Sequence, residues 1–191
     1  MKIKGIILIS ILILTACKQN NDDKNVAQQE NGLPQEVQAE TQEVKDFSEI
    51  GFKLMETETV GDLKMGLTTK EVEKLIGKPS EITPFELWEA DGFEHQARVY
   101  QQETIELDFI KLEDGRIVSN MITITEGCKY KTARNIGIGS TYDEVLQAYN
   151  AEISTPENTS TLIAGTIYGG IIFQFSEENK VNNIFIGAGA E

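Results

Sequence analysis

Histidine, cysteine and basic residues are scarce in this sequence. Its 191 residues include 1 His, 2 Cys, and 17 Lys and Arg against 31 Asp and Glu, which gives a formal net charge of −14. A zinc site takes three or four ligands and a Ser–His or Cys–His pair needs a buried base, so a single histidine argues against both. Because nucleic-acid binding relies on Lys and Arg to neutralise phosphates, the charge balance also argues against a nucleic-acid partner.

Long hydrophobic runs are lacking as well. The apolar run at residues 6–14 is shorter than the ~20 residues that cross a bilayer. Lysines precede it and small residues follow it, which is the pattern of a secretory signal. Residues 14–17, Leu-Thr-Ala-Cys, resemble a bacterial lipobox, and the resemblance implies cleavage before Cys17 and a diacylglyceryl group on its sulfur. Acylated Cys17 would anchor the protein in a lipid bilayer on the extracytoplasmic side. An ordinary signal peptide that happens to end in Cys is the alternative.

The segment after Cys17 lacks aromatic residues. Residues 18–45 are rich in Gln, Asn and Glu, and such a composition buries too little apolar area to offset the cost of ordering. We therefore predict a disordered tether with an r.m.s. span on the order of 30 Å. The expected division is a signal peptide at 1–16, the lipidated Cys17 and tether at 17–45, one repeat at 46–126 and a second at 127–191.

Two segments of the expected folded part resemble each other in sequence. Residues 59–77, TVGDLKMGLTTKEVEKLIG, align without a gap to residues 132–150, TARNIGIGSTYDEVLQAYN. Each copy has an alternating apolar pair, a glycine, and then Thr-x-x-Glu, the capping-box pattern of a helix start. Apolar residues at i, i+3 and i+4 follow, and Gly77 or Asn150 stands where a left-handed residue often ends a helix. We predict one short helix in each copy of a repeated unit.

Strand patterns follow each predicted helix. Residues 104–112 alternate apolar and acidic side chains, and a hairpin turn at 113–116 leads into a return strand. The second copy repeats this arrangement around a turn at 177–180. Residues 47–58 precede the first copy, and their alternation suits an edge strand. The expected fold is α+β, with two tandem repeats of a short helix followed by an antiparallel β-meander.

The repeated unit resembles two known folds. The likeness is carried by Met65-Gly66-Leu67-Thr68, Glu71-Val72, Leu75-Ile76-Gly77-Lys78-Pro79, Ile138-Gly139-Ser140-Thr141 and Glu144-Val145. The tandem arrangement resembles the two-lobed β-lactamase-inhibitor protein. Each half resembles the small lipoprotein of the outer-membrane β-barrel assembly machine, the SmpA/OmlA family. The likeness implies the fold, and an assembly or inhibitory role is the expectation that accompanies it.

Four aromatic residues are candidates for partner binding: Trp88, Phe93, Tyr100 and Tyr168. Several of them would lie on or near concave sheet faces if the halves pack as in the inhibitor fold. Aromatic residues on a rigid sheet are common interface anchors. They are also common in cores, so both interpretations stay open.

The remaining polar candidates have plain structural interpretations. Glu106 and Asp108 could ligate a cation, but strand alternation places them on a solvated face, and no Asp-x-Asp-x-Asp-Gly loop accompanies them. His95 lies in an expected turn and is interpreted as a solvated residue.

Acylation of Cys17 would leave Cys128 as the one thiol, so we expect no internal disulfide. Neighbouring lysines would favour a reactive Cys128 thiolate, whereas a small buried residue between the repeats is the simpler interpretation.

Neither a catalytic constellation nor a phosphate-binding loop stands out in the sequence. We therefore expect a membrane-anchored envelope lipoprotein that is not an enzyme, needs no cofactor, and binds a protein partner in the cell envelope. The alternative is an envelope sensor that binds a cation or a small cell-wall ligand on the acidic strand face. A hydrolase ranks third because no nucleophile–base pair can be named.

The lipobox predicts that Cys17 carries the lipid. Metabolic labelling with an acyl analogue should mark the wild-type protein and leave Cys17→Ala unmarked, because the acceptor sulfur is gone. Equal labelling of both proteins would show that the anchor lies elsewhere.

Overall fold

The computed structural model describes residues 45–154 and 160–189, which belong to the unit Glu43–Glu191. The expected signal peptide at 1–16, Cys17 and tether residues 18–44 lie outside the described residues. The helices of the described part are α1 (Phe47–Thr57), α2 (Thr69–Ile76) and α3 (Tyr142–Ala148). Its strands are β1 (Glu81–Ile82), β2 (Glu86–Leu87), β3 (Glu94–Tyr100), β4 (Ile105–Lys111), β5 (Ile117–Thr125), β6 (Thr161–Thr166), β7 (Gly169–Phe175) and β8 (Val181–Gly187). Among these residues, no helix has the length and apolar character needed to span a membrane.

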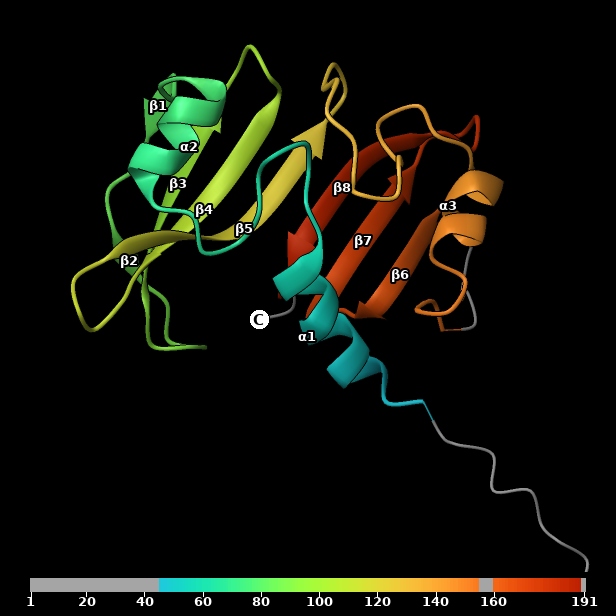
Figure 1. Ribbon diagram of the computed structural model, residues 1–191, viewed down its shortest axis with the longest axis horizontal. Helices are drawn as coiled ribbons and strands as arrows, with labels where there is room; N and C mark the ends of the chain where they lie inside the picture. The colour runs from blue at the N-terminus through green and yellow to red at the C-terminus, as the bar shows by residue number, and fades with distance from the viewer. Residues whose placement is uncertain (1–44, 155–159, 190–191) are drawn as a thin grey trace, which may run out of the picture. The chain divides into compact units, whose positions relative to one another are not determined.

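The strands form one antiparallel sheet, so the predicted α+β class is confirmed. The described sheet has 8 strands in the order β1-β3-β4-β5-β8-β7-β6, and β2 pairs with β3 (Figure 1). Strands β3 to β5 form one meander and β6 to β8 another, and the pairing of β5 with β8 joins them. Ile122 lies opposite Ile186 at this junction, and Ile124 lies opposite Ile184.

One face of the sheet carries the core. On β4, Phe109 is fully buried whereas Glu106 is exposed, which is the period-two alternation of a strand with one wet face. Leu54 of α1, Val72 of α2 and Val145 of α3 belong to the same buried cluster as Phe109, so all three helices cover this face. The opposite face, called the bare face below, has no helix over it within the described ranges.

Both predicted capping boxes are present. The Thr68 hydroxyl accepts a hydrogen bond from the Glu71 N–H, and the Glu71 carboxylate accepts one from the Thr68 N–H at 2.8 Å. Thr141 and Glu144 repeat this exchange at the start of α3, where the N–H to carboxylate distance is 2.7 Å. Gly77 is the C-cap of α2, and its φ of 81° is positive as predicted, but its ψ of −164° lies outside the left-handed helical region.

The end of α3 differs from the prediction. Its C-cap is Tyr149 with a φ of −119°, and Asn150 is not among the residues with positive φ. Tyr149 is fully buried, and its hydroxyl donates to a Glu58 carboxylate oxygen at 2.9 Å. Tertiary packing, rather than a left-handed residue, therefore determines where this helix stops.

The edge strand predicted at residues 47–58 is also wrong, because this segment forms α1. The Asp46 carboxylate accepts hydrogen bonds from two backbone N–H groups of the first turn, at 2.9 and 3.2 Å, and so caps the helix. Ile50 and Leu54 fit a helical spacing of four residues as well as an alternating one, and both contact the core. Phe52, which the alternation grouped with them, is 53% exposed.

Helix α1 approaches the β6–β7 hairpin closely at Gly51. A Cβ added at Gly51 would overlap the Gly169 carbonyl oxygen and lie 3.2 Å from the Gly165 Cα. Glycine is therefore required at Gly51 for a close backbone approach rather than for a positive φ.

We predict that Gly51→Ala lowers the free energy of unfolding by about 1–3 kcal/mol or more, because backbone atoms must move to admit the methyl group. Urea unfolding of the full chain measures the effect. Lys53→Ala, an exposed position in the same helix, should change stability by less than about 0.5 kcal/mol. Equal stability of the two variants would contradict the close approach.

Candidate functional site

A hollow of about 360 Å³ opens on the bare face of the sheet. The segment before β3 forms one wall, and strands β3, β4, β5 and β8 form the floor. The hollow is lined by Thr83, Pro84, Glu86, Trp88, His95, Ala97, Glu106, Asp108, Met121, Thr123 and Phe185. It therefore crosses the β5–β8 junction between the two meanders.

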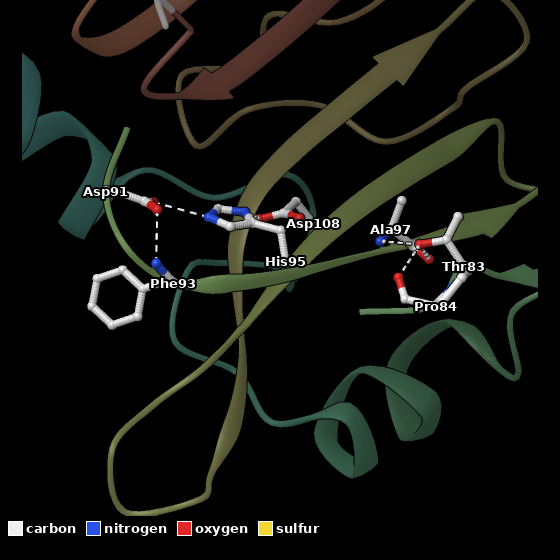
Figure 2. Close-up of polar contacts among 7 residues, drawn as sticks. All are labelled: Thr83, Pro84, Asp91, Phe93, His95, Ala97 and Asp108. Carbon is white, nitrogen blue, oxygen red and sulfur yellow. Dashed lines mark hydrogen bonds and ion pairs between the residues drawn. The ribbon is translucent and has the colours of Figure 1, made fainter. Parts of the chain in front are cut away.

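His95 is held between two carboxylates in the floor of the hollow. Its side chain is 2% exposed, its Nδ1 lies 2.8 Å from Asp108 Oδ2, and its Nε2 lies 2.9 Å from Asp91 Oδ2 (Figure 2). The prediction that His95 is a solvated turn residue is wrong. His95 belongs to β3, and its partners fix the ring at both nitrogens.

Strand register explains how these groups meet. Ala97 lies directly opposite Asp108 in the β3–β4 pair, and His95 is two residues before Ala97 on the same face. His95 and Asp108 are therefore diagonal neighbours, within reach of their side chains. Asp91 comes from the turn between β2 and β3, and its second oxygen accepts the Phe93 N–H at 3.0 Å, which fixes that turn.

Trp88 covers the histidine. The Trp88 and His95 rings stack with their centroids 3.8 Å apart and their planes inclined by 6°. The backbone holds Trp88 in place, since its N–H donates to the Phe93 carbonyl at 2.9 Å and its carbonyl accepts the Gly92 N–H at 2.9 Å. The turn is thus tied to the sheet through both the stack and the Asp91 contact.

The pKa values of the two carboxyl groups are shifted in opposite directions. A neutral imidazole has one N–H, so hydrogen bonds at both ring nitrogens require either a protonated ring or a protonated carboxyl. Burial raises the pKa of Asp108, and hydrogen bonds from His95 and Asn120 offset this only in part. Burial also raises the pKa of Asp91, but hydrogen bonds from Phe93 and His95 outweigh it, so its pKa lies below the ordinary value. Asp91 is therefore the more readily ionised of the two carboxyl groups.

The arrangement limits the chemistry of the described site. Both ring nitrogens of His95 are engaged, so in this geometry the ring has no free nitrogen to accept a proton from a substrate. The nearby Thr83 hydroxyl donates to the Pro84 carbonyl at 3.2 Å and accepts the Ala97 N–H at 3.0 Å. The hydroxyl bonds to backbone groups and lies outside the histidine network, so Thr83 and His95 do not form a nucleophile–base pair in this geometry.

The charges around the hollow have one sign. Glu86, Glu106 and Asp108 line it, and the described lining residues include neither Lys nor Arg. In the part of the chain that the structure describes, no group of three or more His, Cys, Asp and Glu side chains is placed to hold a metal ion. The electrostatics therefore favour a cationic or neutral ligand.

The structure separates the four predicted aromatic residues. Trp88 lines the hollow, and Phe93 is half-buried in the same turn. Tyr100 is 1% exposed and belongs to the core on the opposite face, so its prediction as a partner-binding residue is wrong. Tyr168 is 65% exposed in the β6–β7 turn and does not line the hollow.

The acidic pair and the cysteine also have defined places. Glu106 is exposed, as predicted, but the Asp108 side chain is only 14% exposed because it packs on His95. Cys128 is buried, and burial raises the pKa of its thiol despite hydrogen bonds from Tyr130 and Thr104. The interpretation of Cys128 as a small buried residue is confirmed, and the reactive thiolate is not supported.

Comparisons of this chain with protein-family models, with curated proteins and with solved structures found no match.

We predict that Asp91→Asn and Asp108→Asn change the pH dependence of stability in opposite directions. The folded pKa of Asp91 is lowered, so its ionised form stabilises the fold above the unfolded pKa, and this contribution is lost as the pH falls through the folded pKa. The folded pKa of Asp108 is raised, so protonation favours the fold as the pH falls through that value.

Urea unfolding between neutral and acidic pH tests both signs. As the pH falls, the stability of the wild type should fall relative to Asp91→Asn and rise relative to Asp108→Asn. Glu89→Gln, an exposed position in the same turn, is the matched control. Parallel pH profiles for both aspartate variants would contradict the assignment.

Proposed function

We propose that this protein is a membrane-anchored envelope lipoprotein whose folded part is a non-enzymatic protein-binding module with an assembly or inhibitory role. The observation that carries the binding role is the bare face, hollowed beside Trp88 and covered by no helix among the described residues. Side chains that are already ordered before the partner arrives lower the entropic cost of binding. The stack and the two carboxylate contacts of His95 supply that order.

We also propose that residues 46–126 and 127–191 are tandem copies of one unit, arranged as in the β-lactamase-inhibitor protein. Related hydrogen bonds support the proposal: the Gly66 N–H donates to the Ser119 carbonyl at 2.8 Å, and the Gly139 N–H donates to the Val181 carbonyl at 2.7 Å. Both copies also have a capping box and a following meander. Helix α1 departs from this symmetry, because it packs on β6 and β7 of the other half.

The anchor rests on the N-terminal sequence. A lysine-flanked apolar run ending in Leu-Thr-Ala-Cys suits lipidation of Cys17, and residues 18–45 have the composition of a tether. In this proposal the tether presents the bare face to an envelope protein.

The alternative is an envelope sensor for a cation or a small cell-wall ligand. Glu106 and Asp108 both line this concave site, which favours the sensor hypothesis. The volume of about 360 Å³ is at the small end of ligand pockets. A small ligand would need no protein partner, which separates the two hypotheses.

Site-specific photocrosslinking in cells that make the protein tests the binding role. A photoreactive residue at Gln174, which is exposed on the bare face, should form an adduct with one envelope protein. The same residue at Gln147, which is exposed on α3, should form none and is the matched control.

Equal adducts from both positions, or none from Gln174, would contradict a partner on the bare face. Absence of an adduct together with turnover of an envelope substrate would indicate an enzyme. Calorimetric heat with Ca²⁺ or a peptidoglycan fragment that Glu106→Gln or Asp108→Asn abolishes would favour the sensor.

A further inference from the structure

The hollow constrains what a partner can place against the bare face. The side-chain carboxylates of Glu86 and Glu106 have no hydrogen-bond or ion-pair partner among residues 45–154 and 160–189, and both residues border the hollow. A protein that covers this face removes water from these carboxylates. Burying an ionised carboxylate without a counter-charge is costly, so an apolar or acidic partner segment would bind poorly here.

The walls suit a cation that has an apolar stem. Trp88, Met121 and Phe185 contribute apolar surface beside the carboxylates. Arg and Lys side chains bury their methylene stems on apolar surface and keep the charge at the tip, and a guanidinium can also stack on an aromatic face. The volume of about 360 Å³ is large enough to hold one long side chain.

We infer that the hollow receives one arginine or lysine side chain presented by the protein partner, with its charged tip at Glu106. This inference rests on the proposed protein-binding function and adds the chemistry of the partner. Arginine is the better fit, because its planar guanidinium can donate two hydrogen bonds to one carboxylate. Asp108 is committed to His95, so Glu106 is the principal acceptor.

The sequence provides a reporter inside the site. Trp88 is the single tryptophan among the 191 residues, so intrinsic tryptophan emission of the full chain reports on the hollow. The probes are an acetylated, amidated Ala-Arg-Ala peptide and the same peptide with citrulline, which keeps the shape of arginine and lacks its charge.

The arginine peptide should change Trp88 emission saturably. The citrulline peptide should bind the wild-type protein at least roughly tenfold more weakly than the arginine peptide does. The arginine peptide should bind Glu106→Gln more weakly by the same factor, because each change removes one charge-assisted hydrogen bond. Glu113→Gln, an exposed position in the β4–β5 turn, should leave the titration unchanged. Circular dichroism of each variant shows that the fold is retained.

The outcomes separate this inference from the proposed function. Equal binding of the arginine and citrulline peptides, or no effect of Glu106→Gln, would overturn the cationic receptor even if the Gln174 adduct persists. Tighter binding of Ca²⁺ than of the arginine peptide would also overturn it, in favour of a small cation. Arginine-specific binding without a Gln174 adduct would support the selectivity of the hollow for a cationic side chain and would contradict the proposed protein partner.

Discussion

The antiparallel pairing of β5 with β8 is the constraint on which the rest of the structure depends. It places Ile122 and Ile124 opposite Ile186 and Ile184, so the apolar faces of two separate meanders become one core. Strand side chains alternate with period two, and the same register therefore sets Thr123 opposite Phe185 on the other face. Both residues line the hollow. A shift of one residue at this seam would expose the core isoleucines and dismantle the hollow at the same time.

The His95 network on the bare face is built from polar groups that satisfy one another. An imidazole that is 2% exposed would be costly without partners, and the carboxylates of Asp91 and Asp108 provide them at 2.9 and 2.8 Å. The network also has a mechanical effect, because it fixes the turn that bears Trp88 to the strands below. Breaking one contact would leave a buried charge or a buried donor unpaired, which costs more than the contact itself contributes. The hollow is therefore ordered without any help from a ligand.

Local signals in the sequence were sufficient for some elements and not for others. The helices after Thr68 and Thr141 were predictable because each capping box lies within four consecutive residues. Periodicity alone does not identify helix α1, because Ile50 and Leu54 satisfy both a helical and an alternating pattern, and the Asp46 cap is the local signal that distinguishes the two. His95, Ala97 and Val99 are spaced two residues apart, and this period-two spacing was the available signal for a strand at the histidine.

The site itself lay largely beyond such reasoning. His95 and Asp108 meet only through the β3–β4 register, and no short-range pattern reveals that pairing.

Trp88 and Tyr100 show the same limit, since both are aromatic residues near β3 and they face opposite sides of the sheet.

Composition predicts neither location, but it does bear on what the bare face can bind. A chain with a net charge of −14 attracts cationic surfaces at long range and repels acidic ones, and salt screens this effect. The hollow applies the same selection at contact distance, where Glu86 and Glu106 stand without a basic neighbour in the walls. Long-range charge would thus govern encounter, and the hollow would govern which side chain can be buried. The proposed lipid anchor fits this division, because an acidic domain is repelled by anionic headgroups and keeps its bare face free for a protein.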